Sequence, residues 1–341
     1  MEDKLLEIAQ SIAQCELNLD IVKMIPGDLK NLTRINKRSF LIETDREKLI
    51  LWIYSGQEVG LVFQNQLLRF CQQKDIHGLL YPEELTNGCF YGQLNEKEYY
   101  YLTKAISFDK ISYRNKTQLS SIIELMCNFR KAMTDLGFFY LPEQKGKINI
   151  IIIMAEMLKN LNIFKMLAQF RLKPSYFDKL FLDNYQKIYD SIIKAHFMFE
   201  KSDYLTMFLT LTTQNIIINN YSRDNLRVND NQSYFLHLKN CRNELPIIDL
   251  GALLVKAGRS NQWENSWFNE MIDEYQKYFK ISKSELQILV AYLICPWELY
   301  RLISRYYYNR VNWSVTRFIH KLENYLNDEP YREDFLRQVI M

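Results

Sequence analysis

The stretch that decides the fold of this chain runs from Ile216 to Val228 and reads IIINNYSRDNLRV. It begins with three isoleucines, passes through a polar loop that contains Asn220 and Asn225, and ends in apolar positions that alternate with polar ones. Asn, Asp and Ser favour turns, so the polar middle of the stretch predicts a loop between apolar positions. It lies in a short β-rich segment, 214–240, inside a region that otherwise has helical periodicity.

The loop has the spacing of a phosphotransferase catalytic loop. In small-molecule kinases this loop has the sequence His-Gly-Asp-x-x-x-x-Asn, where the aspartate accepts the substrate proton and the asparagine holds a metal ion. Here Asn225 falls on the metal asparagine, and Asn220 replaces the aspartate. An amide has no ionisable oxygen, so Asn220 cannot act as a general base. Asn225 is either a vestigial metal position or an amide that braces the loop.

Two further charged positions of a kinase are also replaced. The phosphate-contacting lysine of the third strand is expected at Trp52, and the nearest cation, Lys48, is interpreted as a hairpin-turn residue. The metal-binding aspartate one hairpin after the loop is expected at His237, with Lys239 where a second acid often lies. Magnesium prefers oxygen ligands, so these residues predict a degenerate site without a metal or a cofactor.

Other residues could carry chemistry, but each also has a simpler interpretation. Asp224 could be a displaced base, but an ordinary loop carboxylate is the favoured interpretation. His237 and Cys241 could share zinc, but no second ligand pair with suitable spacing lies nearby. Asp249 is interpreted as the N-cap of a helix. Three more histidines have no partner pattern and receive no role: His77, His196 and His320.

Composition sets limits on function. The 341 residues are 48% hydrophobic and carry a formal net charge of +3, which argues against nucleic acid as a partner. The acidic start, 1–4, leads into an amphipathic helical pattern and lacks the form of a signal peptide. The most apolar runs, 148–154 and 286–295, are too short to span a bilayer. Six scattered cysteines indicate reduced, mostly buried thiols, so we expect a soluble intracellular protein without a membrane span.

The order of predicted elements divides the chain into two lobes. Residues 1–107 read as a small lobe with strands at 20–24, 38–43, 48–54, 86–93 and 97–104 and a helix at 59–72. Residues 108–341 read as a large helical lobe with the β insertion at 214–240. Its helices are expected at 117–136, 173–199, 250–256, 262–279, 283–293, 297–308 and 314–326. The predicted class is α+β, a protein-kinase-like bilobal fold.

Several segments together resemble the CotS/YutH-type spore coat proteins of endospore-forming bacteria, which are related to aminoglycoside phosphotransferases and choline kinases. The resemblance runs from about residue 20 to the end, and the order and spacing of its segments carry it. These segments are Tyr99–Leu102, Ile122–Phe138, Asn219–Val228, Cys241–Leu250, Cys295–Tyr300, Arg305–Tyr308 and Trp313. The chain departs from the family pattern where many members keep the loop aspartate and the later Ile-Asp.

The resemblance implies a protein made in the mother-cell cytoplasm and then deposited in the spore coat, with other spore coat proteins as partners. The first hypothesis is a structural or assembly component with an inactive kinase-like fold. The second is a regulatory pseudokinase that still binds nucleotide. The third is an active small-molecule phosphotransferase with an unusual set of residues.

Overall fold

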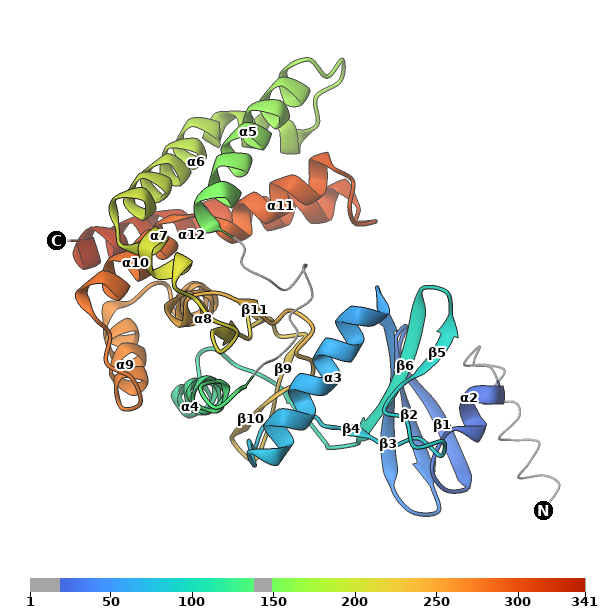
Figure 1. The fold of residues 1–341 in the computed structure, drawn as a ribbon. Coiled ribbons are helices and arrows are strands. Elements are labelled where there is room, and N and C mark those ends of the chain that lie inside the picture. The colour runs from blue at the N-terminus through green and yellow to red at the C-terminus, as the bar shows by residue number, and fades with distance from the viewer. Residues whose placement is uncertain (1–18, 138–148, 341) are drawn as a thin grey trace. The chain divides into compact units, whose positions relative to one another are not determined.

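The computed structural model describes residues 19–137 and 149–340, which form two compact units. Unit 1 contains 19–111 and 222–241, and unit 2 contains 112–137, 149–221 and 242–340. Unit 1 is built mainly of strands and unit 2 mainly of helices (Figure 1). Residues 222–241 thus belong to unit 1, although the chain before and after them belongs to unit 2.

Unit 1 has an antiparallel sheet with the strand order β1-β2-β3-β6-β4, and β5 also pairs with β6. The helix α2 precedes the sheet, and α3 lies between β3 and β4 in the chain. The bounds are α2 Leu19–Lys23, β1 Leu29–Asn36, β2 Ser39–Thr44, β3 Lys48–Ser55, α3 Glu58–Gln73, β4 Pro82–Glu83, β5 Gly92–Asn95 and β6 Glu98–Lys104.

The two faces of this sheet pack against different partners because successive side chains of a strand point to opposite sides. On one face Leu51 joins an apolar cluster that includes Ile21 and Ile25, which lie in and just after α2. On the other face Trp52 packs with Tyr101 of β6 and Leu61 of α3. Trp52 and Tyr101 are direct cross-strand partners, which places both side chains on the α3 face.

The segment 222–241 completes unit 1 with a hairpin. Strands β9 (Leu226–Asn229) and β10 (Gln232–Phe235) pair with each other, and β9 also pairs with β7 (Asp109–Lys110). The backbone N–H of Phe235 donates to the carbonyl oxygen of Gly78 at 2.9 Å, so the end of β10 is joined to the chain that follows α3. This connection brings the residues after β10 to the α3 face of the sheet.

Unit 2 packs its helices around a large apolar core, with the short pair β8 (Ile216–Ile217) and β11 (Arg242–Asn243) beside them. Complete capping boxes at Ser175 and Ser282 fix the starts of two helices. The helices are α4 Lys116–Met133, α5 Ile150–Gln169, α6 Tyr176–Lys201, α7 Tyr204–Leu209, α8 Pro246–Ser260, α9 Asn265–Gln276, α10 Lys283–Ile294, α11 Trp297–Tyr307 and α12 Val315–Ile340.

Several element predictions differ from the structure. The segment 20–24, expected as a strand, lies mostly in a helix, α2, and of the strand expected at 86–93 only the last part is extended, in β5. The helix α5 was not expected, because apolar residues lie on both its buried and its exposed side, so the contrast between its two faces is weak. The helix α12 continues through Pro330, well beyond the expected end. The helical pattern expected at the N-terminus lies outside the described residues.

Within the described ranges, one helical stretch, Lys283–Tyr307, is long and apolar enough to cross a membrane by length and composition. Its most apolar window is 61% buried inside the structure, as expected for helices of a protein core, so this stretch is weak evidence for a span. Four of the five cysteines in the described residues are buried, and all five are free thiols.

Candidate functional site

Two of the residues predicted to mark a degenerate site meet in unit 1. Trp52 lies on β3, and His237 lies two residues after the end of β10. Their ring centroids are 4.6 Å apart with an interplanar angle of 84°, an edge-to-face contact. The indole N–H of Trp52 donates to the hydroxyl of Thr103 at 2.9 Å. The indole thus satisfies its one donor within unit 1 and offers no charge.

Tyr101 completes this group, which we call the aromatic cluster: Trp52, Tyr101 and His237. The hydroxyl of Tyr101 and Nδ1 of His237 share a hydrogen bond of 2.8 Å. Burial raises the pKa of the Tyr101 phenol well above its usual value. Burial, followed by the positive charges of Lys239 and Arg227, lowers the pKa of His237 to about 3. At neutral pH all three side chains are therefore uncharged.

The charged residues near the aromatic cluster do not provide a cation for a phosphate or carboxylate ligands for a metal ion. Lys48 lies at the start of β3 and forms an ion pair with Glu43, and its side chain is 65% exposed. Lys239 lies closer to His237 in the chain, and burial together with the charge of Arg38 lowers the pKa of its ammonium group. A cation here repels a metal ion, so these residues do not fit a magnesium ion carrying a triphosphate.

Asn225 is buried and joins the β9–β10 hairpin to the cluster. Its side-chain oxygen accepts the backbone N–H of His237 at 2.9 Å, and its backbone carbonyl accepts the N–H of Leu236 at 2.9 Å. The asparagine therefore braces the residues that carry His237. The oxygen that a metal ion would need accepts a hydrogen bond from the protein backbone.

In unit 2 the loop that carries Asn220 is held by a buried carboxylate. The two oxygens of Asp249 accept the backbone N–H groups of Ile218 and Asn219, each at 2.8 Å. Asn219 has φ of 54°, a left-handed conformation that asparagine tolerates better than most residues. Burial raises the pKa of Asp249 to about 6, although both backbone hydrogen bonds act in the opposite direction.

The N-cap interpretation of Asp249 was wrong. The helix α8 begins at Pro246 with Leu245 as its N-cap, so Asp249 lies inside the first turn. The proline was an available signal, because proline is common at the first position of a helix. Tyr101 and Thr103 were also missed as members of the site, since their contacts with His237 and Trp52 depend on strand pairing that spacing does not reveal.

Metal ligation finds no support in the part of the chain that the structure describes. No group of three or more His, Cys, Asp or Glu side chains there could hold a metal ion. His196 and His320 lie beside carboxylates on their own helices, at 3.4 Å from Glu200 and 3.5 Å from Glu323. These local pairs require no functional explanation.

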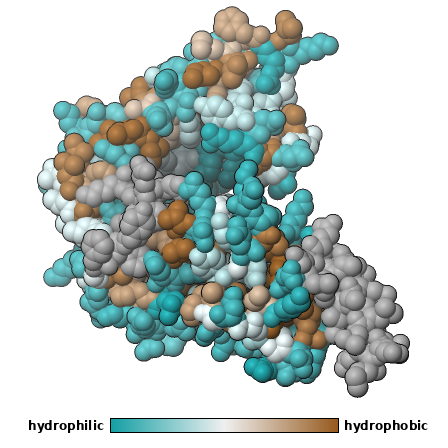
Figure 2. Space-filling view, turned by 45° about the vertical axis from the view of Figure 1, so that its right-hand side comes forward, coloured by the Kyte–Doolittle hydropathy of each residue, from teal (hydrophilic) through white to brown (hydrophobic). Residues whose placement is uncertain are grey.

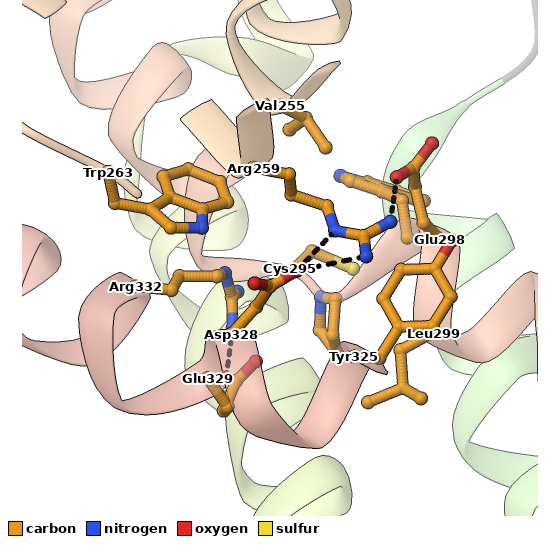
Figure 3. Close-up of a pocket in the computed structure, with 12 residues that line it drawn as sticks. Val255, Arg259, Trp263, Cys295, Glu298, Leu299, Tyr325, Asp328, Glu329 and Arg332 are labelled. Atoms are coloured by element: carbon orange, nitrogen blue, oxygen red, sulfur yellow. Dashed lines mark hydrogen bonds and ion pairs between the residues drawn. The ribbon is translucent and has the colours of Figure 1, made fainter. Parts of the chain in front are cut away.

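A small cavity in unit 2, of about 30 Å³, is lined by residues of α8, α11 and α12 (Figure 3). Arg259 projects into it and forms ion pairs with Glu298 at 3.1 Å and Asp328 at 2.9 Å. Lys256 also forms an ion pair with Glu298, and burial lowers the pKa of Lys256 to about 8. The cavity is about the size of one water molecule, and its charges neutralise one another. We therefore interpret the charged residues around the cavity as a network of ion pairs that stabilises unit 2.

Residues 254–339 match the family model described as "Spore coat putative kinase YutH". No curated protein matches the chain. Among solved structures, the chain is similar to an aminoglycoside phosphotransferase from Alicyclobacillus acidocaldarius, with a TM-score of 0.77 and 14% identity over 94% of this chain and 93% of that chain. It is also similar to a spectinomycin phosphotransferase in its AMP-bound complex, with a TM-score of 0.67 and 12% identity over 89% and 92% of the two chains.

At these identities the similarity concerns the fold alone. It confirms the predicted α+β, protein-kinase-like class with a small β-rich part and a large helical part. The family match confirms the resemblance to spore coat proteins of the YutH type over the end of α8 and all of α9 to α11, and most of α12.

Proposed function

We propose that this chain is a member of the spore coat YutH family and serves as a structural or assembly component of the coat, without phosphoryl transfer. The match at 254–339 supports the family, and the similarity to solved phosphotransferases supports a kinase-like scaffold. The protein would be made in the mother-cell cytoplasm and then deposited in the coat, where other coat proteins are its partners.

The observation that carries the proposed inactivity is the aromatic cluster. Phosphoryl transfer depends on positioning and on neutralising charge, for which kinases use a lysine and metal-bound carboxylates. At the corresponding positions this chain has the neutral side chains Trp52 and His237, which contact each other. An indole and a neutral imidazole provide neither the cation for a phosphate nor the oxygen ligands for magnesium. Asn220 likewise has no ionisable oxygen with which to accept a proton.

Thermal denaturation of the full chain with and without MgATP tests the proposal. A ligand that binds only the native state at 100 times its dissociation constant stabilises it by about 2.7 kcal/mol. We expect no shift of the melting temperature with ATP, GTP or ADP, with or without magnesium, and no nucleotide hydrolysis. A shift without turnover would favour the nucleotide-binding pseudokinase, and measurable transfer to a small molecule would overturn the proposed inactivity.

The proposed location needs a separate measurement. A fluorescent fusion to the chain in a sporulating cell should accumulate first in the mother cell and then around the spore, and it should stay with purified spores through washing. A fusion that remains in the cytoplasm and is lost with the mother cell would refute the coat assignment, whatever the result with nucleotides.

A further inference from the structure

The end of the α5–α6 hairpin in unit 2 exposes a group of large apolar side chains. They lie on the last turns of α5 and in the connection to α6: Ile163, Met166, Leu167, Phe170 and Leu172. Phe170 is 81% exposed and Leu172 is fully exposed. Figure 2 shows apolar surface at the top of the molecule, the end where Figure 1 places the α5–α6 connection. We call these five residues the hairpin tip.

The hairpin tip is not the edge of a buried core. The inner side of α5 already packs through Met157, Leu161 and Phe164, which are buried against the rest of unit 2. The exposed residues of α5 recur three and four positions apart on its opposite side, so they form a second apolar stripe. Contiguous apolar surface of this kind marks an interaction site on a soluble domain.

The segments around the tip are basic. Residues 157–177 contain four Lys or Arg and no Asp or Glu, and residues 299–322 contain five and none. The whole chain has only three more basic than acidic residues, so positive charge is concentrated here. The second segment includes α11, which packs on α5. The ring of Tyr307 on α11 stacks on the ring of Phe164 on α5, with centroids 5.0 Å apart. The two basic segments therefore belong to one side of unit 2.

Some of the charges are already paired. Arg171 donates to the buried carboxylate of Asp178 at 2.9 Å and to the hydroxyl of Tyr306 at 3.0 Å, so it holds the hairpin together. Two lysines flank the tip on exposed positions, Lys159 on α5 and Lys173 beside Leu172. The nearest carboxylates in sequence are Glu156, Asp178, Glu298 and Glu323.

We propose that the hairpin tip docks on an anionic lipid bilayer, with its apolar side chains in the headgroup region and its lysines against acidic headgroups. Exposed apolar residues flanked by lysine and arginine are the composition of surfaces that bind membranes without spanning them. The tip projects at the turn between two helices and has Phe170 and Leu172 almost fully exposed. A fluid bilayer accepts such a projection without a complementary cavity, which a folded protein partner would have to supply.

Flotation of the full-length protein with lipid vesicles tests this proposal. We expect binding to vesicles of phosphatidylcholine with 30% phosphatidylserine, weaker binding at high salt, and none to phosphatidylcholine alone. Each basic residue near such a surface is worth about 1 kcal/mol, or about fivefold in partitioning. The double variant Lys159→Glu, Lys173→Glu should therefore bind at least 25-fold more weakly, by roughly fivefold for each lost lysine.

The apolar contribution is tested with Phe170→Ser combined with Leu172→Ser. These side chains are exposed, so the fold should be retained, as circular dichroism can verify, while binding falls by more than tenfold. The matched controls Ile35→Ser and Lys131→Glu change exposed residues on other elements and should bind like wild type. Wild-type protein that fails to float with phosphatidylserine vesicles at low salt would overturn the proposal. Self-association without lipid binding, abolished by the tip variant, would also overturn it and identify a second copy as the occupant.

Discussion

Replacing His237 by phenylalanine should produce a stability loss that depends on pH. Phenylalanine keeps an aromatic ring beside Trp52 but removes the 2.8 Å hydrogen bond to Tyr101. A buried hydroxyl left without its partner costs about 1–3 kcal/mol. At pH 7, where the imidazole of the wild type is neutral, unit 1 of the variant should therefore be less stable by about 1–2 kcal/mol.

The pH dependence follows from the lowered pKa of His237. The ordinary pKa of 6.5 falls to about 3 in the folded protein, so between these values the unfolded chain binds more protons. Stability from this residue is complete above pH 6.5 and is lost as the pH falls toward 3. From pH 7 to pH 5 the wild type should lose about 2 kcal/mol through His237, a contribution that the variant lacks. The two proteins should therefore be nearly equal in stability at pH 5.

The measurement must report on unit 1, because Asp249 and Glu244 in unit 2 have raised pKa values and an opposite pH dependence. Urea denaturation followed by hydrogen exchange of peptides from β3 and β6 isolates unit 1. The control, His77→Phe, replaces an exposed histidine and should change stability by less than about 0.5 kcal/mol at either pH. If His237→Phe has the same effect at pH 7 and pH 5, the imidazole is not held neutral by its surroundings.

Three more outcomes are expected. Asp249→Asn should destabilise unit 2 by about 1–3 kcal/mol in urea denaturation, because an amide has one oxygen and can no longer accept both loop N–H groups. The control, Asp273→Asn, changes an exposed carboxylate and should leave stability unchanged. Equal effects of the two variants would contradict the anchoring role of Asp249. The side chain of Asp178 is fully buried and accepts four hydrogen bonds, so Asp178→Ala should lower the free energy of unfolding by about 3 kcal/mol. The loss should appear as a lower melting temperature, and an unchanged melting temperature would contradict this. Asn220→Asp with His237→Asp should give no phosphoryl transfer, because the position of Trp52 on β3 still lacks a cation, and robust transfer would show that the strand position is misassigned.

The sequence predicted the elements that have strong local signals. The helix expected at 59–72 is α3, and the strand expected at 48–54 is β3, because the apolar spacing and the turn residues around them agree. The β-rich segment expected at 214–240 contains the strands β8, β9 and β10. These features, with the order of elements, were sufficient for the fold class.

The remaining features depend on contacts between distant parts of the chain. A short segment such as 20–24, with few apolar residues, fits a strand or a helix equally, and packing against the sheet accompanies its helical form in α2. Trp52 and His237 were recognised as unusual residues separately, but their contact requires β10 to be joined to the chain after α3. Asp249 reaches the loop before Asn220 through the placement of α8, which spacing along the chain does not encode.

The division of unit 1 between 19–111 and 222–241 has a consequence for biosynthesis. A nascent chain that has emerged from the ribosome only as far as residue 111 lacks β9, β10 and His237, so the ring of Trp52 has no His237 to pack against. A ribosome that adds about 5–20 residues per second needs on the order of ten seconds to add the intervening residues. During that interval unit 1 is incomplete, and we expect a chaperone that holds unfolded chains to bind it.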